Sequence, residues 1–361
     1  MVHLPEDIIL NFPLPGVPAT IEKYGSGLIN DTYLCSFRVG REIRKYVLQR
    51  INISVFKYPV QVMENVEKVT QHIAARLRAE GVADPYAVTP ALIHTRSGDS
   101  HLVDGSGSFW RVFHFIEQGT VYDRVKDVHH AHEVGRGLGR FQSLVADLAP
   151  SLLHDTLPGF HHTPHYLAEY DDAVARDVQG RAAGVGAEQA FVSRRRSLAP
   201  LLTGLMDAGQ LPLRVVHNDP KVNNVMVHSV TGEALCMLDL DTVKPGIVHF
   251  DFGDCARSIA NPAGEDGDLD SVSFDLPLFR AMARGYLDEA ASFLTRTERD
   301  LLPASVKVIT FELGLRFLTD HLKGDAYFKV RYAGHNLHRA RVQFKLLESI
   351  EAAPLDPVLY L

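Results

Sequence analysis

The stretch Val215–Val227, VVHNDPKVNNVMV, decides how the rest of the chain is interpreted. A short apolar run leads into a polar loop and a second apolar run follows it, a pattern typical of two strands joined by a loop. Within the loop, Asp219 is followed five residues later by Asn224. The next apolar run ends in Asp239-Leu240-Asp241, which begins 20 residues beyond Asp219. The pattern therefore predicts carboxylates and an amide at the ends of neighbouring strands.

This combination of side chains suits phosphoryl transfer. Transfer from ATP requires a carboxylate that orients the attacking hydroxyl, and oxygen ligands that hold Mg²⁺ on the phosphates. An Asp followed five residues later by an Asn has the spacing of the kinase catalytic loop. We expect Asp219 to be the catalytic carboxylate, and Asn224 and Asp239 to bind the metal. For Asp241, a bridge to a second Mg²⁺ and a hydrogen bond within its own loop both remain open. A plain polar turn would also use Asn and Asp, but the flanking strands argue against it.

The chain around this loop divides into two parts. From Thr20 to about Phe115, β-branched and aromatic runs alternate with turns, interrupted by a helical pattern over Val60–Leu77. From Val128 onward the pattern is mainly helical, apart from a β-rich insert that carries the polar loop. We predict an α+β, bilobal, protein-kinase-like fold. Its antiparallel N-terminal lobe would span 1–118 and bind nucleotide, and its mainly helical C-terminal lobe would span 119–361 and hold the catalytic and substrate-binding residues.

The N-terminal part supplies candidate nucleotide contacts. Gly25 and Gly27 precede a strand rather than a helix, so they predict a phosphate-covering loop and not a dinucleotide fingerprint, although an ordinary hairpin turn is the alternative. The strand position at which kinases carry a lysine holds Gln49. Because Gln has no charge, neutralisation of the phosphates would depend more on Mg²⁺. Adenine is expected against the backbone of Phe115-Ile116-Glu117.

Several motifs, in this order, resemble those of one family. The chain is similar to the N-acetylhexosamine 1-kinases, anomeric sugar kinases within the aminoglycoside phosphotransferase and choline kinase superfamily. The resemblance is carried by residues 24–33 (YGSGLINDTY), 217–224 (HNDPKVNN), 238–242 (LDLDT) and 250–254 (FDFGD), with 314–320 and 324–328 further on. It implies that ATP, with Mg²⁺, phosphorylates the anomeric 1-OH of GlcNAc, GalNAc or a related hexose, giving a sugar 1-phosphate and ADP.

The resemblance also implies roles for single residues. It assigns the sugar contacts to Asn30, Thr242, Arg316 and Tyr327. Asp251-Phe252-Gly253 spells the metal-binding triplet of protein kinases, but it lies 32 residues beyond Asp219, and the shorter gap to Asp239 suits the hairpin of this fold. Asp251 and His217 are therefore expected to brace the catalytic loop. Leu28 stands where the family carries His, which removes one polar contact.

Composition excludes other classes of function. The 361 residues are 46% hydrophobic and 22% charged with a formal net charge of −7, which gives no electrostatic case for a nucleic-acid partner. The sequence contains no run of 18 apolar residues, the length that a membrane-spanning helix needs. Three widely spaced cysteines, Cys35, Cys236 and Cys255, suit a reducing compartment. We expect a cytoplasmic monomer whose partners are ATP and a small sugar.

Alternatives remain open at this stage. The acceptor could be an aminoglycoside, homoserine or choline: an aminoglycoside site needs many carboxylates, for which Asp320 and Asp325 are candidates, and a choline site needs an aromatic cage. Arg316 could form a structural ion pair within its helix. An inactive nucleotide-binding pseudokinase is the alternative of another class. The histidine clusters at 129–132 and 161–165 favour capping and packing over zinc.

Overall fold

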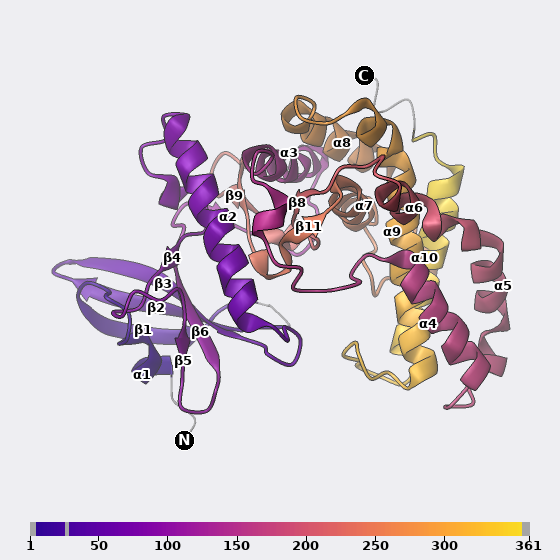
Figure 1. The fold of residues 1–361 in the computed structure, drawn as a ribbon, viewed down its shortest axis with the longest axis horizontal. Helices are drawn as coiled ribbons and strands as arrows, with labels where there is room; N and C mark the ends of the chain where they lie inside the picture. Colours follow the sequence, from indigo (N-terminus) through magenta and orange to yellow (C-terminus); the bar gives the residue numbers. More distant parts are fainter. Residues whose placement is uncertain (1–4, 26–28, 356–361) are drawn as a thin grey trace.

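The computed structural model describes residues 5–25 and 29–355. Its N-terminal part is an antiparallel sheet in the order β1-β2-β3-β6-β4, with β5 paired to β6. The strands are β1 (Val17–Lys23), β2 (Asp31–Val39), β3 (Glu42–Ile51), β4 (Leu92–Ile93), β5 (Leu102–Val103) and β6 (Phe109–His114). Figure 1 shows this sheet on one side of the molecule and the helices on the other. The predicted α+β class, with an antiparallel sheet lobe followed by a helical lobe, is confirmed.

One face of the sheet is apolar because side chains alternate along each strand. Cys35 and Phe37 of β2, Leu48 of β3 and Trp110 of β6 are buried. They pack against the short helix α1 (Pro5–Ile9), whose Ile8 and Ile9 belong to the same cluster. The opposite face contributes polar side chains to the candidate site.

Helix α2 (Pro59–Ala79) follows β3 but packs with the helical lobe. Its buried residues Val62, Val66 and Val69 share one hydrophobic cluster with the helices that follow. Asn65, also buried, donates to the carbonyls of His154 and Val243 at 2.8 and 3.0 Å. The helix between the two parts in Figure 1 is thus fixed to the lobe that carries the polar loop.

The C-terminal part is mainly helical. Its helices are α3 (Val128–Leu144), α4 (Thr163–Arg176), α5 (Gly186–Arg195), α6 (Pro200–Asp207), α7 (Val248–Ile259), α8 (Leu276–Ala290), α9 (Arg296–Lys323) and α10 (His335–Ala352). Helices α3 and α8 approach closely at glycines: a Cβ on Gly135 would collide with the carbonyl oxygen of Met282, and one on Gly285 with that of His132. The run Gly135-x-Gly137-x-Gly139 therefore serves helix packing.

Two small sheets frame the polar loop. One has the order β10-β9-β7 and the other pairs β11 with β8. Their strands are β7 (Gly119–Thr120), β8 (Arg214–Val216), β9 (Val225–His228), β10 (Ala234–Met237) and β11 (Lys244–Gly246). At the connection between the lobes, Gly119 packs closely against Met226 on β9, and a Cβ there would require the flexible Met226 side chain to shift.

Candidate active site

The predicted catalytic loop connects β8 to β9 and is held from below by Asp251 of α7. The fully buried Asp251 carboxylate accepts the backbone N–H groups of His217 at 2.8 Å and Asn218 at 2.6 Å. It also accepts Nε2–H of Gln142 at 2.8 Å, and Tyr286 in turn donates to that amide at 2.6 Å. Three hydrogen bonds thus hold the Asp251 carboxylate against the loop. From the sequence, Asp251 was expected to brace this loop.

Asn218 is held in the left-handed backbone region with φ of 67°. A non-glycine residue there costs free energy and persists only when its surroundings impose it. Its backbone carbonyl contacts Nε2 of the buried His161 at 3.1 Å, and Nδ1 of His161 lies 2.9 Å from Glu312. Burial alone would lower the pKa of His161, but the Glu312 carboxylate raises it above its usual value. His161 and Glu312 thus support the Asn218 backbone, a contact that sequence reasoning did not identify.

Asp219 itself faces outward from the loop, with 26% of its side chain exposed. Asn224 donates Nδ2–H to the Asp219 backbone carbonyl at 2.8 Å and to Oδ2 at 3.2 Å. Lys221 places Nζ 3.0 Å from the other carboxylate oxygen, a contact that sequence reasoning missed. Burial raises the pKa of Asp219 and the charge on Asp254 raises it further, against the opposing effect of Lys221. A carboxylate of this kind accepts a proton more readily than one in water.

Asp239 is tied to the same loop through the backbone. The Leu238 N–H donates to the carbonyl of Asn224 at 2.7 Å, and the Leu238 carbonyl accepts Nε2–H of His217 at 2.7 Å. Asp239 follows directly and, like Asn218, has a positive φ, 57°. The end of β10 is therefore locked against the residues around Asp219.

Desolvation and the negative charges of Asp241 and Asp219 outweigh the positive charges of Arg111 and Lys221 in their effect on Asp239. Asp239 is an exposed residue, but the protein around its carboxylate displaces part of the water and the charges on Asp241 and Asp219 repel it, which together raise the pKa of Asp239 to about 7. The neighbouring donors are carboxylate and amide oxygens, the ligands Mg²⁺ prefers. These oxygens are of the type that a hard divalent cation prefers, so Asn224 and Asp239 stay the expected ligands.

Asp241 points across to the N-terminal lobe. It is 1% exposed, and its Oδ2 accepts Nδ2–H of Asn30 at 2.7 Å. Its Oδ1 forms an ion pair with Arg111 of β6, which is also 1% exposed. Gln49 of β3 lies beside that guanidinium: its Oε1 accepts two N–H groups of Arg111 at 3.1 and 2.9 Å, and its Nε2 donates to Thr32. Arg111 was not singled out from the sequence.

The predicted adenine contacts lie where β6 leads into β7. The rings of Tyr24 and Phe115 meet edge to face, with centroids 6.1 Å apart. Ile116 is buried, and Glu117 pairs with Lys45 at 3.3 Å. Gly25 has φ of 78°, whereas Gly27 and Leu28 lie outside the described residues.

The four predicted sugar contacts form two groups. Asn30 and Thr242 adjoin the catalytic loop, and the Thr242 hydroxyl donates to the carbonyl of His217 at 2.7 Å. Arg316 of α9 and Tyr327, which is 70% exposed, lie in a second group. Among the described residues no hydrogen bond joins the two groups.

Arg316 lies inside an aromatic cage. Its guanidinium carbon is 4.9 to 6.0 Å from the ring centroids of Phe160, Tyr166, Tyr327 and Phe328. Within the described ranges it makes no ion pair shorter than 4.0 Å; Glu312, one turn earlier, is occupied by His161 and Thr163. The structural ion pair considered for Arg316 is thus not formed with its helix neighbour.

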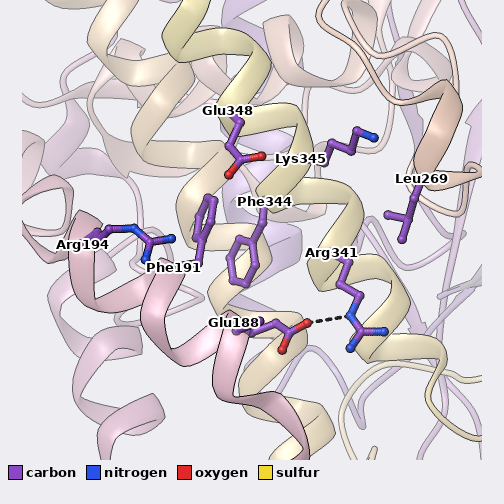
Figure 2. Close-up of a pocket in the computed structure, with 9 residues that line it drawn as sticks. Glu188, Phe191, Arg194, Leu269, Arg341, Phe344, Lys345 and Glu348 are labelled. Carbon is purple, nitrogen blue, oxygen red and sulfur yellow. Dashed lines mark hydrogen bonds and ion pairs between the residues drawn. The ribbon is translucent and has the colours of Figure 1, made fainter.

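Other candidate features lie apart from this loop. Figure 2 shows a pocket of about 350 Å³ between α5 and α10, crossed by the Glu188–Arg341 ion pair at 2.6 Å and containing none of the predicted site residues. In the histidine-rich segment at 161–165, His162 caps α4 by accepting the N–H of His165. Within residues 5–25 and 29–355, no helix is both long and apolar enough to cross a bilayer.

A family model described as the phosphotransferase enzyme family matches residues 20–290, well over half of the chain. The chain belongs to this phosphotransferase family. The fold is that of the family and of protein kinases, as predicted. The structure is similar to a microcompartment-associated aminopropanol kinase, with a TM-score of 0.62, 16% identity and 95% of each chain covered.

Further similar structures have other acceptors in their names. An aminoglycoside phosphotransferase from Alicyclobacillus acidocaldarius has a TM-score of 0.59 and 12% identity, covering 100% of this chain and 98% of its own. A choline kinase from Cryptosporidium parvum has a TM-score of 0.55 and 13% identity, covering 95% and 93%. At these identities the likeness establishes the fold alone. Arg316 and Tyr327 lie beyond the residues that the family model matches.

Proposed function

We propose that this phosphotransferase moves the γ-phosphoryl group of ATP, with Mg²⁺, to a hydroxyl of a small neutral sugar. The acceptor we favour is the anomeric 1-OH of an N-acetylhexosamine or a related hexose, so that the products are a sugar 1-phosphate and ADP. The proposal rests on the fold, on the side chains gathered around Asp219, and on the aromatic rings around Arg316 of α9.

Our choice of acceptor depends on the aromatic cage around Arg316 of α9. A quaternary ammonium is bound when aromatic faces surround an empty space. Here the cage already holds the guanidinium of Arg316, between 4.9 and 6.0 Å from four ring centroids. A second cation would be repelled, whereas hydroxyl and carbonyl oxygens would find N–H donors and a flat aromatic surface. This disfavours a choline-type acceptor and favours a sugar.

The acidic residues considered for an aminoglycoside are engaged elsewhere. Asp320 is buried and accepts the backbone N–H groups of Ala326, Tyr327 and Phe328 at 2.8 to 3.0 Å. Asp325 pairs with Arg181 at 2.7 Å. A polycationic acceptor needs carboxylates that are open to it. These two instead hold the loop that carries Tyr327.

The side chains of the loop suit the transfer. Asp219 accepts the hydrogen bond of the acceptor hydroxyl and orients its oxygen toward the γ-phosphorus. As the new O–P bond forms, the bond from the γ-phosphorus to the bridging oxygen breaks, ADP keeps that electron pair, and the hydroxyl proton passes to Asp219. Bound at Asn224 and Asp239, Mg²⁺ would neutralise phosphate charge. An anomeric hydroxyl is more acidic than an ordinary alcohol, so positioning matters more than basicity.

A panel of acceptors tests the proposal. The purified protein is incubated with Mg²⁺, ATP and one of GlcNAc, GalNAc, glucose, galactose, choline, aminopropanol, homoserine or kanamycin. ADP release gives the rate and phosphorus NMR gives the position of the product phosphate. We expect the highest kcat/KM with a hexose and a phosphate coupled to the anomeric proton. Faster turnover of an amino alcohol or aminoglycoside, or a 6-phosphate product, would overturn the choice of acceptor. No ADP release with any compound would favour the inactive nucleotide-binding module.

A further inference from the structure

We propose that Arg111 of β6 binds the nucleotide phosphates, in place of the lysine that strand β3 lacks. We further propose that the Asp241 carboxylate is paired with Arg111 while no nucleotide is bound. The proposal rests on the proposed kinase function and names a further residue of that site. Kinases of this fold place a lysine on the third strand for the phosphates. Here that strand carries Gln49, and the cation comes from the adjacent strand instead.

The sheet register puts Arg111 at the required place. Residue 111 on β6 is the direct cross-strand partner of Gln49 on β3. Directly paired residues project from the same face of the sheet. Gln49 turns its Oε1 to two N–H groups of the guanidinium, at 3.1 and 2.9 Å, and Thr32 accepts from the other end of the amide. Gln49 therefore orients the cation rather than replacing it.

The lysine–glutamate ion pair of protein kinases has no direct counterpart in the described part of this chain, where Arg111 pairs with a carboxylate of the other lobe. Protein kinases pair the strand lysine with a glutamate of the helix that follows. In this chain Glu67 of α2 contacts His94 at 2.6 Å, and the α2 side chain that faces Arg111 is Met63, whose sulfur lies 3.8 Å from Nη1. The carboxylate that pairs with Arg111 is Asp241, two residues after Asp239 and in the opposite lobe.

This placement favours a ligand role over a purely structural one. A buried ion pair contributes little net stability, because desolvating both charges offsets their attraction. A guanidinium has five N–H donors, and here three nitrogens serve two oxygens and one weakly accepting sulfur. Four of the five N–H donors make these contacts. Because the side chain is 1% exposed, phosphate oxygens would take the remaining donor and the one that Asp241 releases.

The pairing implies an exchange of partners. When nucleotide and Mg²⁺ enter, the Asp241 carboxylate can turn toward the metal and leave the guanidinium to the phosphates. Without Mg²⁺, Asp241 competes with the phosphates for Arg111. Removing its charge should therefore strengthen the binding of metal-free nucleotide.

Isothermal titration calorimetry in EDTA with adenosine, ADP and ATP tests the assignment. The Arg111→Gln variant should bind ADP and ATP roughly 10–100-fold more weakly and adenosine with unchanged affinity, since a charged hydrogen bond is lost. Arg50→Gln is the matched control: Arg50 neighbours Gln49 in β3, projects from the other face and pairs with Asp31. It should bind all three ligands as the wild type does.

The outcomes separate the possible failures. Equal loss of adenosine and ADP binding in Arg111→Gln, or unchanged ADP binding, would overturn the role of Arg111. Asp241→Asn keeps the arginine and should raise the affinity for metal-free ADP several-fold without changing that for adenosine; no gain would also overturn the proposal. Wild-type protein that binds neither ADP nor ATP would contradict the kinase function itself.

Discussion

Asp219 is the side chain on which the proposed chemistry depends most directly. It accepts hydrogen bonds from the Asn224 amide and contacts Lys221, while a quarter of its surface stays open to an acceptor. For Asp219→Ala we expect kcat to fall roughly 10²–10⁴-fold, since an orienting general base is removed. ADP affinity should change little, because the nucleotide contacts lie elsewhere. Initial rates of ADP release and calorimetry measure both, and wild-type turnover in the folded variant would assign the role to another residue.

Asp239 provides a separate test of the metal site. Asp239→Asn keeps the size of the side chain but removes the charge that we expect to bind Mg²⁺. The Mg²⁺ concentration for half-maximal activity should rise roughly 10–100-fold, as expected for one lost charged interaction. The control Asp172→Asn removes a carboxylate from a surface ion pair on α4 and should leave the titration unchanged. An identical Mg²⁺ titration for Asp239→Asn would remove Asp239 from the metal site.

For single residues, the sequence indicated which side chains lie in the same loop, but not which residues distant in the chain come into contact. The sequence placed Asp219 and Asn224 in one loop between two recognisable strands, and the structure shows the Asn224 amide donating to the Asp219 backbone carbonyl within that loop. Arg111 and Asp241 are 130 residues apart, and a strand arginine carries no signal that distinguishes it from a surface residue. The position of Arg111 follows from the β3–β6 register, which only the folded sheet reveals.

Among the elements, the contact of α3 with α8 is tight enough to test by adding one carbon. In Gly135→Ala the new methyl group would overlap the carbonyl oxygen of Met282, a backbone atom that cannot turn away. We expect the free energy of unfolding to fall by about 1–3 kcal/mol or more. Gly204→Ala is the control, since no atom lies within 4 Å of that Cβ on α6, and it should be neutral or slightly stabilising. Urea unfolding measures both; a neutral Gly135→Ala would mean that the helices can separate.

Helix α7 should respond to acid through His249. Burial lowers the pKa of His249 to about 4, and its Nδ1 has no hydrogen-bond partner among the described residues, while Nε2 contacts the Glu298 carbonyl at 2.9 Å. The unfolded chain, with a pKa near ~6.5, binds the extra proton first. Stability should therefore fall as the pH drops from about 6.5 to about 4, by about 1.4 kcal/mol per unit at most. In His249→Gln the decline measured by urea unfolding over this window should be shallower; parallel curves would contradict the assignment.

The boundaries of elements were predicted where a local signal exists. The pattern over Val60–Leu77 agrees with α2. The start of a new helix, α6, at Pro200 was not predicted. Helix α3 begins at Val128, where the Asp127 side chain caps it by accepting the His130 N–H.

For the molecule as a whole, the packing does not follow the order of the chain. The sheet has its own hydrophobic cluster, whereas α2, which precedes β4 to β6 in sequence, belongs to the core of the helical lobe. The proposed boundary at residue 118 separates the sheet from the catalytic loop in sequence, but Asn65 joins α2 to the backbone of Val243 beside that loop. Periodicity predicted that α2 has an apolar face and could not show which lobe would cover it.

For the whole molecule, the central claim is that Asn224 and Asp239 of the C-terminal lobe bind one divalent ion next to Asp219. A crystal structure with ADP and Mn²⁺, located by its anomalous scattering, tests this most directly. The account predicts one Mn²⁺ at about 2 Å from Oδ1 of Asn224 and a carboxylate oxygen of Asp239, bridging to the ADP phosphates, with the Asp219 carboxylate facing the acceptor side. An ion bound elsewhere, with Asn224 and Asp239 sharing none, would contradict it.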